Sequence, residues 1–207
     1  MGRQEQTNHL FSNRDLRILL VPLIVEQILN SLMGTADSIM VSNVGSAAIS
    51  AVSLVDSINI LVIQAFYALA AGGTIVCSQY IGQKDKKNAE ESARQLSFVV
   101  ACISSAVMAV CLLTRGPLLR LIFGSVEADV MEAAQIYFFY TALSFPFIAL
   151  YDAGSSIYRA QGNTRLPMTI AVVSNGLNIA GNAVLIWGFH LGVAGAAIAT
   201  LGSRVIS

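Results

Sequence analysis

The sequence has little charge. Lys, Arg, Asp and Glu together make up 12% of its 207 residues, whereas a soluble globular domain carries about 25%. A surface that faces water cannot be made from so few charged side chains, so the composition indicates an integral membrane protein. The twelve basic and twelve acidic side chains cancel, and the lack of excess positive charge excludes a nucleic-acid-binding protein.

Cysteine and histidine are also scarce. Cys77, Cys102 and Cys111 lie in or beside apolar segments without metal-binding spacing, so they are predicted to be small buried side chains. His9 and His190 stand apart from any Cys/His cluster. The motifs H-E-x-x-H, G-x-S-x-G and G-x-x-x-x-G-K-[ST] are absent, so the sequence predicts neither an enzyme nor an ATP site, and no cofactor.

Long apolar runs dominate what is present. A helix needs about 20 mainly apolar residues to cross about 30 Å of hydrocarbon. Six segments meet that requirement, namely 16–42, 46–77, 96–114, 130–158, 166–189 and 191 onward. The sequence therefore predicts an all-α, polytopic membrane bundle of six transmembrane helices over residues 16–207, after a tail of residues 1–15. The sixth segment is still apolar at Ser207, so we expect it to be truncated.

Basic residues predict the orientation of these spans, because Lys and Arg concentrate in cytoplasmic connections. With the N-terminus inside, ten basic residues are cytoplasmic and two are external. The inner set is Arg3, Arg14, Arg17, Lys84, Lys86, Lys87, Arg94, Arg159, Arg165 and Arg204, and the outer set is Arg115 and Arg120. We therefore expect a multi-pass protein of the cell (plasma or inner) membrane, surrounded by lipid, with a cytoplasmic N-terminus.

The segment QKDKKNAEESARQ, residues 83–95, is the one strongly charged connection. Lys87/Glu91 and Glu90/Arg94 are spaced i,i+4, which favours a short helix at the inner surface.

Two prolines lie within the spans. Pro22 and Pro146 each free a backbone carbonyl in their helix, so bends are expected there. Asp152 lies seven residues before Arg159, and pairing with a basic group is its expected role.

Polar residues within the spans fall on helical faces. Three stripes are visible: Glu26, Asn30 and Asp37 in the first span, Asp56, Asn59 and Gln64 in the second, and Asn175, Asn178 and Asn182 in the fifth. A charged side chain in the bilayer costs about 2.5–3.5 kcal/mol on insertion scales, so such stripes turn away from lipid. By helical rise, Asp37, Asp56 and Asn182 all lie in the outer half of the membrane. The pattern predicts a shared polar chamber there.

The stripes have two interpretations. Amides and acids can simply join helices to one another, which is the better explanation for an isolated Asn. A buried acid is costly for that purpose, so Asp37 favours a functional chamber. Such a carboxyl group can exchange a proton, or bind Na⁺ or an organic cation when it is ionised.

Four stretches of the sequence occur in an order that resembles the multidrug and toxic compound extrusion (MATE) transporters. They are PLIVEQILNSLMGTADSIMVSNVG, ALAAGGTIVCSQYIGQKD, YRAQGNTRLPM and LNIAGNAVLIWG, and the resemblance covers about residues 14–207. It implies two six-helix lobes around a central cavity, which exchange H⁺ or Na⁺ for organic cations by alternating access. The chain would then be the N-terminal lobe, and its partner would be a missing C-terminal half.

The resemblance also implies roles for individual residues. Asp37 matches the first-helix acid implicated in coupling to H⁺ or Na⁺, and Asn178 matches a fifth-helix polar ligand. Pro22 matches a proline at which the first helix bends. Asn182 stands where many members have Asp, and Glu26 and Asp56 are candidates for the missing carboxylate.

The leading hypothesis is a half of an antiporter that exports organic cations or drugs, with Asp37, Asn178 and Asn182 at the coupling-ion site and possible Na⁺ binding at Asp37. The predicted substrate pathway comprises Glu26, Asn30, Asp56, Asn59, Gln64 and Asn175, and Pro22 is the predicted hinge. Two alternatives are a flippase for lipid-linked or amphipathic substrates and a non-transporting membrane scaffold.

Overall fold

Residues 13–207 are described in a computed structural model, with side chains from residue 16 onward, so most of the predicted 1–15 tail lies outside the described residues. The helices are α1 (Asn13–Ser42), α2 (Ser46–Gly82), α3 (Lys86–Phe123), α4 (Ala128–Leu143), α5 (Phe145–Ala160), α6 (Arg165–Asn182), the π-helix η1 (Ala183–Gly188) and α7 (Gly192–Ile206). Short connections join them, and residues 13–207 contain no strand.

Each of the six predicted spans corresponds to a helical unit. The helices α1, α2, α3 and α6 with η1 are each long and apolar enough to cross a bilayer, and α7 is a shorter apolar helix. The helices α4 and α5 together form one span that is bent by 43°. The predicted fold class, an all-α membrane bundle, is therefore confirmed.

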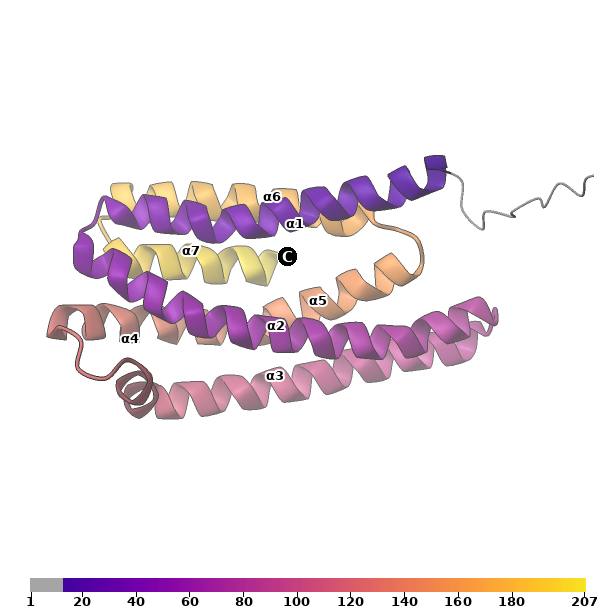
Figure 1. Cartoon of the computed structure of the whole chain (residues 1–207), viewed down its shortest axis with the longest axis horizontal. Coiled ribbons are helices and arrows are strands. Elements are labelled where there is room, and N and C mark those ends of the chain that lie inside the picture. The colour runs from indigo at the N-terminus through magenta and orange to yellow at the C-terminus, as the bar shows by residue number, and fades with distance from the viewer. Residues whose placement is uncertain (1–12) are drawn as a thin grey trace, which may run out of the picture.

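The helices run back and forth along one long axis, as Figure 1 shows. The helix α1 lies along α6, and α7 packs against both α6 and α4. On the other side, α2 packs against α3, α4 and α5. One end of the bundle holds the α2–α3 and α5–α6 connections, and is called the α2–α3 end below. The opposite end holds the α1–α2 connection and is called the α1–α2 end.

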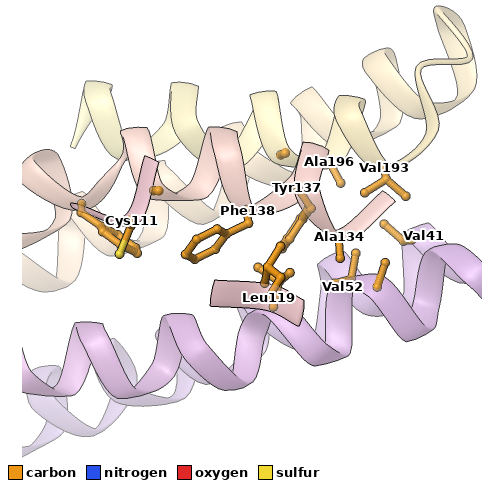
Figure 2. Close-up of a cluster of buried hydrophobic side chains, with 14 of the residues drawn as sticks. Val41, Val52, Cys111, Leu119, Ala134, Tyr137, Phe138, Val193 and Ala196 are labelled. Carbon is orange, nitrogen blue, oxygen red and sulfur yellow. The ribbon is translucent and has the colours of Figure 1, made fainter. Parts of the chain in front are cut away.

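An apolar core fills the space between α1, α2, α3, α4 and α7 at the α1–α2 end. Figure 2 shows Tyr137 and Phe138 of α4 in its centre, with Val41, Val52 and Val193 beside them. These side chains are at most 9% exposed. In lipid this packing stabilises the bundle through van der Waals contacts, because apolar side chains that leave lipid gain no hydrophobic free energy.

The outward surface of the bundle carries large, exposed apolar side chains, as expected for a surface in contact with lipid. Leu61, Leu113 and Leu121 are 73–85% exposed, which water would disfavour and acyl chains tolerate. Cys77 and Cys111 are buried as predicted, but Cys102 is exposed on α3, so its predicted burial was wrong. In a membrane helix an apolar side chain can face lipid as well as protein, and hydropathy cannot separate the two cases.

The break between α4 and α5 occurs at Ser144, two residues before Pro146. The Ser144 hydroxyl donates to the Thr141 carbonyl at 2.6 Å, and Arg204 of α7 donates to the Ser144 hydroxyl at 2.7 Å. The bend expected at Pro146 is thus present and has a side chain from α7 docked on it. At Pro22, α1 continues as one helix without interruption.

The charged connection differs from its prediction. Residues 86–95 form the first turns of α3 rather than a separate surface helix. Asp85 caps this helix by accepting a hydrogen bond from the Asn88 N–H at 3.2 Å. Arg94 pairs with Glu91 at 2.7 Å, an i,i+3 contact, and no ion pair joins Glu90 or Lys87 in the described part of the chain. Since both partners are exposed, the pair stabilises the helix little.

Small residues allow α7 to approach α6 and η1 closely. A Cβ atom on Gly195 would lie 3.0–3.2 Å from backbone atoms of Leu185 and Ile186, and a Cβ on Gly181 would lie 3.0 Å from the Ala199 side chain. Close approach of this kind is how helices gain packing energy in lipid, where a hydrophobic driving force between them is missing.

Replacing Gly195 by Ala should therefore destabilise the protein. The added methyl group meets backbone rather than a flexible side chain, so we expect a loss of about 1–3 kcal/mol, as for other overpacked sites. Gly202 lies on the same helix with open space around its Cα, and Gly202→Ala is the matched control. Thermal unfolding in detergent measures both, and equal midpoints for the two variants would contradict the close α7–η1 contact.

Candidate functional site

Four buried polar side chains from three helices form one hydrogen-bonded network, called the Asp37 cluster below. Its members are Asp37 of α1, Asn178 and Asn182 of α6, and Thr200 of α7, each at most 3% exposed. Asn182 Nδ2 donates to Asp37 Oδ1, and the Thr200 hydroxyl donates to Asp37 Oδ2 at 3.0 Å. Asn178 Nδ2 donates to Thr200 Oγ1 at 3.1 Å. The structure thus brings together the three residues predicted for the coupling-ion site.

Helix geometry explains why these side chains meet. Asn178 and Asn182 are four residues apart, so both project from the same face of α6, and Asn182 Nδ2 also lies 3.4 Å from Asn178 Oδ1. The contact between Gly181 and Ala199 brings α6 and α7 together at this level, which lets Asn178 reach Thr200. Asp37 lies five residues, or about 7.5 Å of helical rise, from the end of α1 at Ser42.

The Asp37 carboxyl group has no salt-bridge partner within residues 16–207. Each Asp37 oxygen accepts one hydrogen bond. Asn182 Oδ1 is buried and lacks a hydrogen-bond partner in the same part of the chain. The carboxylate, amide and hydroxyl oxygens are ligands that hard cations favour, and a proton can bind the carboxylate instead. The described residues contain no group of three His, Cys, Asp or Glu side chains suited to a metal ion.

A second polar group, on α2 and α4, lies beside the Asp37 cluster. Asp56 Oδ1 accepts hydrogen bonds from Asn59 Nδ2 and the Tyr137 hydroxyl, both at 3.3 Å. Asp56 is close enough to Asp37 for their charges to repel, although no hydrogen bond joins them. Of the predicted α2 stripe, Gln64 is exposed and does not join this group. Asp56 therefore places a second carboxyl group near Asp37 without becoming part of its network.

Glu26 does not supply a second carboxylate to the Asp37 cluster. It is 3% exposed and pairs with Arg159 of α5, whose Nη1 lies 3.0 and 3.1 Å from its two oxygens. The Tyr151 hydroxyl donates to Glu26 at 3.1 Å. This pairing also corrects the expected role of Asp152, because Arg159 contacts Glu26 and leaves Asp152 Oδ2 buried without a partner in residues 16–207. The position of Glu26 on its helical face predicted that its side chain points inward, but it did not predict that Arg159 would be its partner.

The remaining predicted residues lie apart from the cluster. Asn30 of α1 is exposed. Asn175 of α6 is buried, but its side chain donates to the Ala171 carbonyl of its own helix at 2.9 Å. Pro22 is buried on α1, fifteen residues before Asp37.

Sequence reasoning missed three residues that shape this region. Thr200 bonds Asp37 directly, Tyr137 bonds Asp56, and Arg204 lies near both acids while donating to Ser144. Thr200 was the one polar side chain between Val193 and Leu201, and that isolation within an apolar helix was the available signal. Tyr137 carried no signal, because an apolar segment accommodates tyrosine without a special role.

Comparison with known proteins shows that the chain is similar to membrane transporters. The MatE family model matches residues 22–184. The chain is 35% identical to the uncharacterized transporter YisQ of Bacillus subtilis, with 98% of this chain and 44% of YisQ covered. It is 28% identical to the probable multidrug resistance protein NorM of Thermotoga maritima, with 93% and 42% covered.

Solved structures agree with these relatives. The chain is similar to a MATE protein in complex with MaL6, with a TM-score of 0.87 and 25% identity over 93% of this chain and 42% of the other. It is also similar to a MATE protein in the bent conformation, with a TM-score of 0.84 and 26% identity over 93% of this chain and 43% of the other. The chain thus spans about two fifths of the length of these relatives.

Removing the Thr200 hydroxyl should weaken the Asp37 cluster. Thr200→Val keeps the shape of the side chain but leaves Asp37 Oδ2 and the Asn178 amide each without a partner, so we expect a loss of about 1–3 kcal/mol in the free energy of unfolding. Thr200→Ser keeps the hydroxyl and serves as the control. Thermal unfolding of the full-length protein in detergent compares them. A Thr200→Val protein as stable as wild type would show that the network contributes nothing.

Proposed function

Because this chain belongs to the MatE family, we propose that it forms one half of an ion-coupled antiporter that exports organic cations or drugs by alternating access. The single observation that carries the proposal is a buried carboxylate, Asp37, that accepts hydrogen bonds from two other helices and has no salt bridge within residues 16–207. The relatives named as multidrug resistance proteins support the substrate class. The other half, about as long as this one, completes the cavity.

The Asp37 cluster is proposed to couple ion binding to helix position. The ionised carboxylate holds α1 to α6 through Asn182 and to α7 through Thr200. A proton or Na⁺ on Asp37 neutralises the acceptor, which weakens these charge-assisted hydrogen bonds. The arrangement of α1 against α6 and α7 then depends on whether the ion is bound. The two arrangements therefore differ in their affinity for the ion, and this difference is what allows ion binding to shift the population between them.

The amide at position 182 bears on the coupling ion. An Asp there would place two carboxyl groups within hydrogen-bonding distance, whereas Asn182 offers one neutral oxygen, Oδ1, that lacks a partner in residues 16–207. Together with Asp37, this oxygen can contribute to a Na⁺ site, and Asp37 alone suffices for a proton. We therefore propose a site for one monovalent ion, with Pro22 as the hinge of α1.

Acidic and amide groups are proposed to form the substrate pathway. Asp56 and Asn59 lie beside the Asp37 cluster, and Asn30 and Gln64 are exposed on α1 and α2. Their negative and neutral polar character favours a cationic substrate over an anionic one. Glu26 is set aside from this pathway, since Arg159 neutralises its charge.

The cytoplasm is proposed to face the α2–α3 end of the bundle. Lys84, Lys86 and Lys87 all lie in or next to the α2–α3 connection at that end, and Arg159 and Arg165 flank the α5–α6 connection. The excess of basic residues at this end supports the proposed orientation, because Lys and Arg concentrate in cytoplasmic connections.

Cysteine labelling tests the orientation. In a protein whose native cysteines are replaced by serine, Ser125→Cys in the α3–α4 connection should react with a membrane-impermeant maleimide in intact cells. Lys87→Cys at the start of α3 should react only after the membrane is broken. Both positions are exposed in the structure, so labelling reports location rather than burial, and the reverse pattern would overturn the proposed orientation.

Loss of the Asp37 charge should abolish ion-driven efflux. In the full-length protein, Asp37→Asn removes the titratable group while keeping the size of the side chain, so we expect insertion at wild-type level and an efflux rate at least tenfold lower. The efflux rate is measured as the loss of a fluorescent organic cation from vesicles that contain the protein, after a pH jump and, separately, after a Na⁺ jump.

The matched control is Glu91→Gln, which removes a carboxylate from an exposed position on α3 whose side chain is 44% exposed. It should leave efflux unchanged. Gradient-dependent efflux by Asp37→Asn at the control's rate would contradict the assignment of Asp37.

A further inference from the structure

Pro22 leaves a backbone carbonyl on α1 without its helical partner. In an α-helix the N–H of residue 22 donates to the carbonyl of Ile18, but proline has no N–H. The helix nevertheless continues through this point without a break. Something outside α1 therefore has to satisfy the Ile18 carbonyl, since an unpaired carbonyl within a membrane protein is costly.

Thr164, from the α5–α6 connection, provides that partner. Its hydroxyl donates to the Ile18 carbonyl at 3.4 Å, and the residue is 3% exposed. Thr164 occupies the N-cap position of α6, where a threonine side chain ordinarily accepts a hydrogen bond from its own helix. Here it makes no such bond. The hydroxyl is directed to α1 instead, while Asn163 accepts from the Leu166 N–H at 3.3 Å.

A second contact holds α1 on the other side of Pro22. Glu26 lies four residues after the proline, one turn along the helix, and is bound by Arg159 and Tyr151 of α5. The Arg159 side chain is only 20% exposed, and its guanidinium lies 5.9 Å from the ring centroid of Tyr67 on α2. Arg159 Nη1 contacts both Glu26 oxygens while Nη2 donates to Ser156 at 3.2 Å, and removing one partner of the pair would leave a buried charge uncompensated.

We infer that Thr164 and the Glu26–Arg159 pair form a two-point clamp that holds α1 in its observed conformation across Pro22. One point lies before the proline and the other after it, and both are supplied by α5 and the α5–α6 connection. Bending at Pro22 changes the position of Ile18 relative to Glu26, so at least one of the two contacts has to break. The clamp therefore sets how easily α1 bends, and Thr164 and Arg159 are positioning residues rather than ion ligands. The inference rests on the proposed role of Pro22 as a hinge.

The test compares Thr164→Val in two backgrounds of the full-length protein. In wild type, Thr164→Val leaves the Ile18 carbonyl unpaired. In Pro22→Ala, residue 22 regains its N–H and satisfies that carbonyl within α1, so the Thr164 hydroxyl is no longer needed. Spin labels at Leu20 on α1 and Phe98 on α3, which are 50% and 69% exposed, report the position of the first turns of α1 by pulsed electron resonance.

We expect Thr164→Val to raise the population with a displaced α1 by about threefold to tenfold, which corresponds to the loss of one neutral hydrogen bond. Thr164→Ser should restore the wild-type distribution, and Thr164→Val should have no effect in the Pro22→Ala background. The matched control is Thr169→Val, an exposed position on α6 whose hydroxyl bonds its own helix at the Arg165 carbonyl.

Every outcome decides the question. Failure of Thr164→Val to fold in wild type, with recovery in Pro22→Ala, supports the cap on Ile18. An equal shift or equal misfolding in both backgrounds, or a shift in neither, overturns it.

Arg159→Gln tests the second point of the clamp and should displace α1 more strongly than Thr164→Val does. Arg94→Gln, which removes a cation from an exposed ion pair, should not displace α1. The spin labels measure helix position and not transport. If Asp37→Asn showed normal efflux, the proposed coupling role of Asp37 would be refuted, but the result for the clamp would still hold.

Discussion

The bundle depends on one carboxylate that lipid and apolar side chains cannot solvate. Asp37 is tolerated because donors on α6 and α7 take the place of water around it. Those donors reach it only where α6 and α7 lie close together, which the small residues Gly181 and Ala199 permit. The polar network thus determines the packing of three helices, and the packing in turn determines which side chains can bind an ion.

The first helix is fixed by polar contacts at three depths and by apolar contacts elsewhere. Near its start, Ile18 and Glu26 are bound by the α5–α6 region, and near its end Asp37 is bound by α6 and α7. All of these partners come from the second half of the chain, whereas α2, the neighbour in sequence, contacts α1 mainly through apolar side chains. A movement of α1 therefore separates it from α5, α6 and α7 together.

The sequence was sufficient for the spans, because a continuous apolar run of 20 residues has few alternatives in a membrane protein. Helical spacing placed Asp37, Asn178 and Asn182 on inward faces, and the resemblance to MATE transporters grouped these three into one site. The sequence could not identify Arg159 as the partner of Glu26, because pairing between helices depends on rotation about each axis, which periodicity within one helix does not fix. For the same reason Gln64 was grouped with Asp56 although it is exposed.

The π-helix η1, which follows Asn182, accommodates one more residue than an α-helix would between the Asp37 cluster and the turn into α7. Its wider winding is closed by the Phe189 N–H, which donates to the Val184 carbonyl five residues earlier. Deleting a single residue within 183–188 would tighten that winding to an ordinary α-helix. Because five α-helical residues turn through about the same angle as six π-helical ones, α6 and the start of α7 would keep their register relative to each other. A relative that is one residue shorter at this point is therefore expected to keep both Asn182 and Thr200 in contact with Asp37.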